Sequence, residues 1–261
     1  MLIFVRGMTA AVLAFTLMLG ACSVTDDSGS ETTIPATYDM SGITIDGLVK
    51  AMTDTLTGAK SITMHVEKTF DDILETGHKV QYSGAIDIAL RRPDRLYVSY
   101  GDDFASREVW FDGNQFVLQD HLARVHGQLP AAGTVDATLE ALAEKYDVVM
   151  PLAGLLGDNV QQLIDENLQY GLYIGFSDVE GVPAHHVLLS SDTADWQFWI
   201  DAGETPLPLK IVVTDTTEPS EPQKTFLFTD WDLAADLPDS MFTPDIPEDS
   251  ALAAFLPKKG N

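Results

Sequence analysis

Residues 60–70, KSITMHVEKTF, decide the fold of this chain, because apolar and polar side chains alternate along them. Every second side chain shares one face: Ile62, Met64, Val66, Lys68 and Phe70. A period of two is typical of a β-strand that buries one face. The same period returns in residues 80–91, where Ile86, Ile88 and Leu90 occupy alternate positions. The two segments therefore predict neighbouring strands of a sheet.

Strand patterns continue on both sides of a different middle region. Strands are expected at residues 95–100, 106–111 and 115–119, and then at residues 168–176, 184–190, 195–201, 208–215 and 223–231. Asp112-Gly113-Asn114 is a strong hairpin signal, and Arg92-Pro93-Asp94 is a turn. Because the connections are short, we expect about ten antiparallel strands in one sheet.

Two regions have helical rather than strand periodicity. In residues 42–59, apolar residues recur every three or four positions, which predicts an amphipathic helix packed on the sheet. Residues 134–166 are expected to form an apolar helical insertion between the two runs of strands. The chain is expected to end in a Pro-rich, irregular tail. Together these elements predict an α+β fold in a single domain over residues 42–261.

The charge and the cysteine content exclude several classes of function. The chain of 261 residues has 40 acidic and 15 basic residues, which gives a formal charge of −25. Such a chain repels nucleic acid and anionic lipid head groups, so we expect no nucleic-acid partner. The single cysteine excludes an intrachain disulfide, a four-cysteine metal site and CxxC redox chemistry. The hydrophobic content of 45% is that of a folded globular protein.

The first 21 residues have the pattern of a secretory signal peptide. One cation, Arg6, precedes an apolar run over residues 7–19, which is too short for a membrane-spanning helix. The run ends in Leu19-Gly20-Ala21-Cys22, which resembles the bacterial lipobox. This resemblance implies acylation of the Cys22 thiol, cleavage before Cys22 and a stable lipid anchor in the membrane. The alternative is an ordinary signal peptide in which Cys22 is incidental.

Residues 22–41 read as the lipidated cysteine followed by a flexible linker rich in Ser, Thr and Asp. Ser23 follows the cysteine, at the position where the enteric lipoprotein pattern has Asp for retention in the inner membrane. We therefore expect a lipid-anchored protein at the periplasmic face of the outer membrane.

Five short stretches resemble a family of uncharacterised predicted periplasmic proteins. They are Arg92-Pro93-Asp94-Arg95-Leu96, Phe111-Asp112-Gly113, Val182-Pro183-Ala184-His185-His186-Val187, Trp196-Gln197-Phe198-Trp199-Ile200 and Pro206-Leu207-Pro208-Leu209-Lys210. The resemblance covers roughly residues 40–257, and its motifs are turns and aromatic strands rather than catalytic signatures. The order of elements also resembles that of the bacterial lipoprotein carriers LolA and LolB. This likeness implies a strongly curved, open half-barrel with capping helices and, by analogy, a hydrophobic ligand.

A half-barrel that its helices only partly fill leaves an apolar cavity on its concave face. The candidate ligand-binding residues are apolar side chains of the late strands and of the helical insertion: Trp196, Phe198, Trp199, Phe226, Phe228, Leu152, Leu155 and Leu156. Trp196 and Trp199 point to opposite sides of one strand. The alternative is a fully packed core in which the helices fill the half-barrel.

Constellations that would carry catalysis or bind a metal are weak in this sequence. His185 and His186 are adjacent, so in a strand their side chains face opposite sides. Acidic pairs such as Asp71-Asp72 are typical of a solvated surface, and no GxSxG, P-loop or GxGxxG pattern occurs. We therefore expect no enzyme, no metal site and no cofactor.

Three functional hypotheses follow. The first is a lipid-anchored, non-enzymatic envelope protein that binds a lipid or the acyl chains of a lipoprotein. The second is a periplasmic protein-interaction or envelope-stress sensor module, which exposes an apolar patch instead of enclosing a ligand cavity. A third hypothesis is a hydrolase whose site has no recognised motif.

Overall fold

The computed structural model describes residues 42–131, 133–146, 148, 150 and 152–258. The described residues between 42 and 258 belong to one compact unit. The signal peptide, Cys22 and the linker expected in residues 1–41 lie outside the described residues. Within the described part of the chain, no helix is long and apolar enough to cross a membrane.

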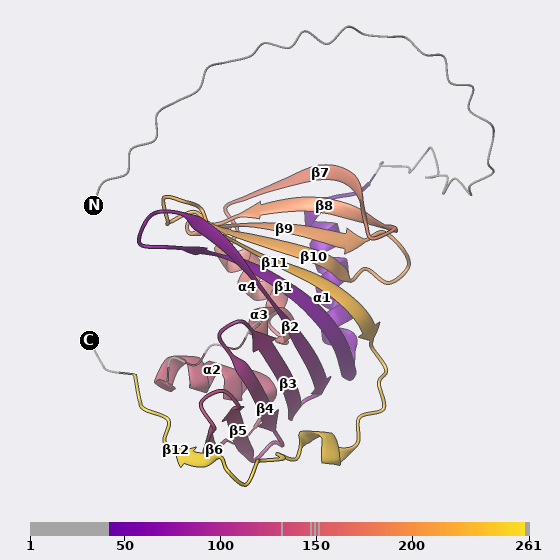
Figure 1. Cartoon of the computed structure of the whole chain (residues 1–261). Helices are drawn as coiled ribbons and strands as arrows, with labels where there is room; N and C mark the ends of the chain where they lie inside the picture. Colours follow the sequence, from indigo (N-terminus) through magenta and orange to yellow (C-terminus); the bar gives the residue numbers. More distant parts are fainter. Residues whose placement is uncertain (1–41, 132, 147, 149, 151, 259–261) are drawn as a thin grey trace, which may run out of the picture. The chain divides into compact units, whose positions relative to one another are not determined.

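The described residues contain twelve strands in one sheet, which Figure 1 shows as a curved ribbon of arrows. The strands are β1 (Ser61–Ile73), β2 (Lys79–Arg91), β3 (Arg95–Asp102), β4 (Ser106–Phe111), β5 (Gln115–Asp120), β6 (Val125–Pro130), β7 (Tyr170–Val179), β8 (Val182–Ser190), β9 (Ala194–Asp201), β10 (Pro208–Asp215), β11 (Gln223–Asp232) and β12 (Ala251–Ala253). Their order across the sheet is β12-β6-β5-β4-β3-β2-β1-β11-β10-β9-β8-β7. The first strand pairs with β11, so the early and late strands join in one unclosed sheet.

The expected α+β fold with a curved, open, mostly antiparallel sheet is confirmed, and the sheet has twelve strands where about ten are expected. The two missed strands are β6 and β12. In β6, Gly127 and Pro130 interrupt the apolar alternation that identifies a strand. The tail is not irregular throughout, because β12 pairs in parallel with β6, with Leu252 beside His126. Three residues are too few to show a period.

Four α-helices of the described residues lie on one side of the sheet (Figure 1). They are α1 (Ile45–Gly58), α2 (Val135–Tyr146), α3 (Ala153–Leu156) and α4 (Val160–Asn167). The side-chain oxygen of Thr44 accepts a hydrogen bond from the backbone N–H of Gly47 and caps α1. The three buried apolar residues of α1, Val49, Met52 and Leu56, pack into the core. The expected helical insertion is thus α2, α3 and α4.

The helices give the sheet an inner face, which they cover, and an outer face. One large core lies between the helices and the inner face, and it runs from α1 through Val66 on β1 to Phe198 on β9. On the outer face, residues 233–250 form a C-terminal strap over the early strands. Leu237 and Phe242 of the strap pack against Ala89. Arg91 donates a hydrogen bond to the carbonyl of Leu237 at 2.6 Å and holds the strap in place.

Candidate binding groove

An apolar groove of about 250 Å³ lies between the inner face of the early strands and the segment that joins α2 to α3. Its apolar lining is Val98, Val109, Leu118, Val148 and Met150. The first three are cross-strand neighbours on β3, β4 and β5, so they form one row across the sheet. The other two come from the segment between the helices and lie over that row. The groove therefore has the apolar face of the sheet as its floor, and Val148 and Met150 form its cover.

The next row of the sheet closes one end of the groove with polar side chains. Tyr100 and Arg107, which also line the groove, are direct cross-strand partners, and Asp120 is the partner of Arg107 on β5. The Arg107 Nε donates a hydrogen bond to the Asp120 carboxylate at 2.9 Å. Among the described residues, the two terminal nitrogens of Arg107 have no hydrogen-bond acceptor. One wall of the groove thus ends in an arginine with free donors.

A lysine and an aspartate meet one row further along. Lys68 and Asp102 lie in register on either side of Gly84, and their side chains are only 13% and 4% exposed. A Cβ at position 84 would lie 2.5 Å from the carbonyl oxygen of Gly101 and 2.6 Å from the Asp102 Cβ. The missing side chain of Gly84 therefore lets the two charged side chains meet over the strand between them. Even so, the Lys68 Nζ stays 3.9 Å from the Asp102 carboxylate.

Tyr100 connects the lysine to the aspartate. The Lys68 Nζ donates a hydrogen bond to the Tyr100 hydroxyl at 3.1 Å, and that hydroxyl donates to the Asp102 carboxylate. Burial lowers the pKa of Lys68, and the charge of Asp102 offsets this only in part. Burial also acts to raise the pKa of Asp102, but hydrogen bonds from Tyr100 and from two backbone N–H groups lower it overall. Lys68 is thus a cation in an environment that disfavours its charge.

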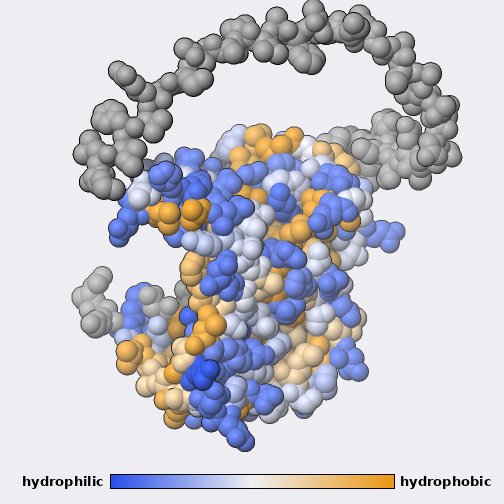
Figure 2. All heavy atoms as spheres, in the orientation of Figure 1, coloured by the Kyte–Doolittle hydropathy of each residue, from blue (hydrophilic) through white to orange (hydrophobic). Residues whose placement is uncertain are grey.

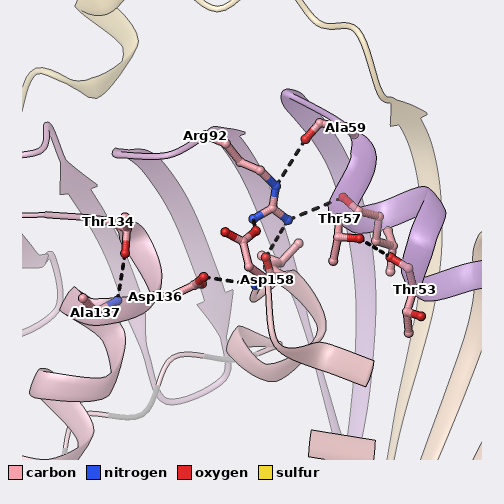
Figure 3. Close-up of polar contacts among 10 residues, drawn as sticks. Thr53, Thr57, Ala59, Arg92, Thr134, Asp136, Ala137 and Asp158 are labelled. Atoms are coloured by element: carbon pink, nitrogen blue, oxygen red, sulfur yellow. Dashed lines mark hydrogen bonds and ion pairs between the residues drawn. The ribbon is translucent and has the colours of Figure 1, made fainter. Parts of the chain in front are cut away.

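Arg92 fixes the helices over the inner face, as Figure 3 shows. Its guanidinium donates hydrogen bonds to the carbonyls of Ala59 at 3.2 Å and Leu156 at 2.8 Å, and it pairs with Asp158. A longer bond of 3.4 Å reaches the carbonyl of Leu56. These carbonyls belong to the C-terminal ends of α1 and α3, which leave such groups unpaired. One side chain from the turn after β2 therefore holds two helix ends together.

The eight residues expected to bind a ligand lie elsewhere, and none of them is among the described residues that line the groove. Five are buried in the large core: Phe198, Phe226, Phe228, Leu155 and Leu156. Leu152 packs against the same core. Trp196 is 40% exposed, and its ring is stacked on that of Phe198 at 6.4 Å.

Trp199 lies on the outer face, opposite to Trp196 and Phe198, as the strand alternation predicts. Its ring stacks on His186 at a centroid distance of 4.0 Å, and the Lys210 ammonium lies 4.6 Å from the centre of the Trp199 ring. The eight candidates are thus divided between a packed core and two surfaces. Tyr100, Arg107 and the aliphatic groove residues were not among the predicted binding residues, although the alternation of residues 95–100 and 106–111 places Tyr100, Val98, Arg107 and Val109 on the apolar face.

A second hollow, of about 720 Å³, is an open surface beside α4. The described residues that line it all carry carboxylates or amides, including Asp136, Asp165 and Glu166. No group of three or more His, Cys, Asp or Glu side chains in the described part of the chain is placed to hold a metal ion. In Figure 2 blue, hydrophilic residues cover much of the visible face of the domain, with orange apolar residues between them. The apolar groove is therefore the better candidate for a binding site.

The fold and the groove together define a class: an α+β domain whose open sheet keeps an apolar groove on its inner face. The family model described as "Predicted periplasmic protein (DUF2092)" matches residues 46–256, and the chain belongs to this family. No curated protein sequence is significantly similar to the chain.

Several solved structures have a similar fold at low sequence identity. The chain in the Pseudomonas aeruginosa MucA/MucB complex is 15% identical, with a TM-score of 0.43; the alignment covers 76% of this chain and 60% of that one. This chain thus spans less than two thirds of that relative. LprF from Mycobacterium bovis is 10% identical, with a TM-score of 0.44 and coverage of 79% and 97%. A LolA superfamily protein from Nitrosomonas europaea is 10% identical, with a TM-score of 0.35 and coverage of 77% and 98%.

Proposed function

We propose that this periplasmic protein is a non-enzymatic carrier or receptor that binds a lipid, or the acyl chains of a lipoprotein, in the groove on its inner face. The observation that carries the proposal is the hollow of about 250 Å³ beside the row Val98, Val109 and Leu118, at the margin of the large core. Burying one methylene there is worth about 0.8 kcal/mol. An acyl chain gains affinity with every carbon that leaves water.

The size of the groove limits what it holds in this conformation. A volume of 250 Å³ accommodates about eight methylene groups, if each fills about the 30 Å³ of a water molecule in the liquid. A longer chain must displace the cover. Among the described residues, the cover is held by the backbone bonds from Val148 N–H to the Leu142 carbonyl at 3.2 Å and from Ala153 N–H to the Met150 carbonyl at 3.3 Å. We expect ligand binding to move Val148 and Met150 rather than the sheet.

The test is to fill the groove from its floor. Val109→Phe places a larger side chain in the hollow, and Val182→Phe makes the same change at an exposed position of β8. We expect the native chain and Val182→Phe to bind the neutral dye N-phenyl-1-naphthylamine with a rise in its fluorescence. Val109→Phe should lose at least nine tenths of that signal while it keeps its circular dichroism spectrum. Equal dye binding by the two variants would contradict the proposal, as would a native chain that binds no dye.

We also propose that Cys22 carries the lipid anchor and holds the domain at the periplasmic face of the outer membrane. The proposal rests on the tetrapeptide Leu19-Gly20-Ala21-Cys22 and on Ser23. Mass spectrometry of the protein from its native host should find an acylated Cys22 as the first residue. Cys22→Ser should release the protein from the outer-membrane fraction. A mature chain with an unmodified Cys22 would contradict the anchor.

One observation favours the second hypothesis, a protein-interaction or sensor module. Edge strand β7 exposes a row of apolar side chains, with Tyr170, Leu172 and Ile174 between 42% and 55% exposed. No charged residue lies between Tyr170 and Ser177. Such a row is typical of a surface that another protein covers. If Leu172→Glu abolishes capture of a stoichiometric periplasmic partner and leaves dye binding intact, β7 rather than the groove carries the function.

A further inference from the structure

The groove ends in donors that an apolar ligand does not use. Arg107 lines the groove, its side chain is 49% exposed, and only its Nε has a hydrogen-bond acceptor among the described residues. Arginine presents its donors in a fork that matches a carboxylate or a phosphate. The two terminal nitrogens of Arg107 are therefore available at the point where the apolar lining stops.

A second cation, Lys68, does not line the groove itself but contacts the groove residue Tyr100. The Lys68 Nζ has one hydrogen bond, to Tyr100, and its carboxylate neighbour is 3.9 Å away. The ammonium also lies 4.2 Å from the centre of the Phe70 ring and 5.0 Å from that of Tyr100. Replacing a buried ion pair with apolar side chains is often neutral or stabilising, so stability alone does not account for a lysine at this position. A ligand anion would give Lys68 the close partner that Asp102 does not provide.

We propose that the groove takes single-chain anionic amphiphiles, with the alkyl chain on Val98, Val109 and Leu118 and the acidic head group on Arg107 and Lys68. This inference rests on the proposed function and specifies the ligand class of the same site. The alkyl chain and the head group meet different rows of the sheet, because Tyr100 and Arg107 directly follow the apolar row.

The charge of the whole chain works against such a ligand at long range. A formal charge of −25 repels anions, and this repulsion is screened beyond about 10 Å at 0.1 M salt. Contacts with Arg107 act at hydrogen-bond distance and are screened much less. We therefore expect an anionic amphiphile to bind better at 0.15 M salt than at 0.01 M salt. A ligand held at an exposed basic patch would show the opposite dependence.

The test compares three probes with the same tail and different heads: dodecanoate, dodecan-1-ol and dodecyltrimethylammonium. Each competes with N-phenyl-1-naphthylamine for the full chain carrying Cys22→Ser, below its micelle concentration. We expect dodecanoate to displace the dye at about one tenth of the concentration that dodecanol needs, since a hydrogen bond to a charged group contributes about 1.5 kcal/mol or more. Dodecyltrimethylammonium should be the weakest competitor.

Two variants assign the preference to the proposed residues. Arg107→Gln should bring dodecanoate to within about twofold of dodecanol, and Lys68→Met should reduce the preference in the same direction. Lys50→Gln, which removes an exposed cation of α1, should leave it unchanged. Arg107 is half exposed, so its variant remains informative if Lys68→Met does not fold.

The outcomes separate this inference from the function on which it rests. If dodecanol competes as well as dodecanoate against the native protein, the anionic head group is wrong and the apolar groove stands. If the preference survives in Arg107→Gln, the head group is not held where we propose. If neither the dye nor any dodecyl probe binds, the proposed function and this inference both fail.

Discussion

The inner face of the sheet is tightly packed under the late strands, whereas a hollow remains beside one row of the early strands. Under the late strands, large aromatic side chains such as Phe198 and Phe228 fill the space up to the helices. At one row across β3, β4 and β5, formed by Val98, Val109 and Leu118, a hollow remains at the margin of the same core. The groove therefore lies at one aliphatic row, whereas the neighbouring row of β4 and β5 is filled by the buried rings of Phe111 and Phe116.

The outer faces of the early and late strands differ in whether another segment covers them. The C-terminal strap covers the early strands and buries its own Leu237 and Phe242 against Ala89. The late strands have no such cover among the described residues, and there Trp199 is shielded by His186 and Lys210. The half of the sheet that carries the groove on its inner face is thus the half that the strap covers on its outer face. We infer that the strap supports the strands that line the groove.

The largest expected effect on the free energy of unfolding tests the difference between the packed core and the groove. Phe228→Ala in the packed region should lower the free energy of unfolding by about 3–5 kcal/mol, because it leaves a cavity in a core that cannot collapse. Val98→Ala at the groove should cost only about 1–2 kcal/mol, because it removes two carbons beside an existing hollow. Urea unfolding measures both. Equal losses would show that the groove residues are as tightly packed as the core.

The next effect concerns the helices that cover both regions. Arg92→Met should lower the free energy of unfolding by about 2–4 kcal/mol, because the carbonyls of Ala59 and Leu156 lose their donor. Arg124→Met removes an exposed arginine that is paired with Asp249, and it should cost less than about 1 kcal/mol. If the two variants unfold at the same urea concentration, Arg92 does not hold the helix ends.

The smallest effect distinguishes the two regions by the sign of their pH dependence. A hydrogen bond to Asp87 raises the pKa of His65 on β1, whereas burial lowers the pKa of His185 on β8. His65 therefore stabilises the fold at pH values below 6.5, and this contribution is lost as the pH rises through its raised folded-state pKa. His185 stabilises the fold above pH 6.5, and this contribution is lost as the pH falls toward its lowered folded-state pKa.

Urea unfolding of His65→Gln and His185→Gln at pH 5.5 and 7.5 measures these contributions. We expect His65→Gln to be more harmful at the lower pH and His185→Gln at the higher pH. His78→Gln, a change at an exposed residue of the β1–β2 turn, serves as the control. Two histidine variants with the same pH dependence would contradict the opposite environments of the two rings.

Much of the fold could be predicted from local patterns, because alternation and turns are local properties. The run from residue 208 to 215 is β10 with the same bounds, and the expected hairpin at Asp112-Gly113-Asn114 joins β4 to β5. The strand β6 was missed because Gly127 has no side chain to add to the pattern; in the fold its place is taken by the ring of Phe255. This contact joins two residues that are 128 positions apart, so no local sequence pattern predicts it.

The candidate site was harder to predict than the fold. The aromatic strand of Trp196, Phe198 and Trp199 was favoured as a cavity wall, and the fold places these rings in the core or at the surface. Whether a side chain lines a hollow depends on what the helices cover, and this is set by tertiary packing. The polar row could have been predicted from the sequence. Lys68 occupies an apolar position in the alternation of residues 60–70, and Arg107 occupies one in residues 106–111.

The short parallel strand β12 also limits how copies of this protein can associate. It covers the end of the sheet at β6 with three residues, too few to serve as a template for a further strand. The other end, at β7, is long and has no partner strand among the described residues. A sheet with two such ends can add molecules without limit and grow into a filament. A sheet with only one free edge strand can pair with one other copy. Once two such edges meet, neither copy has a free edge left, and growth stops at a dimer.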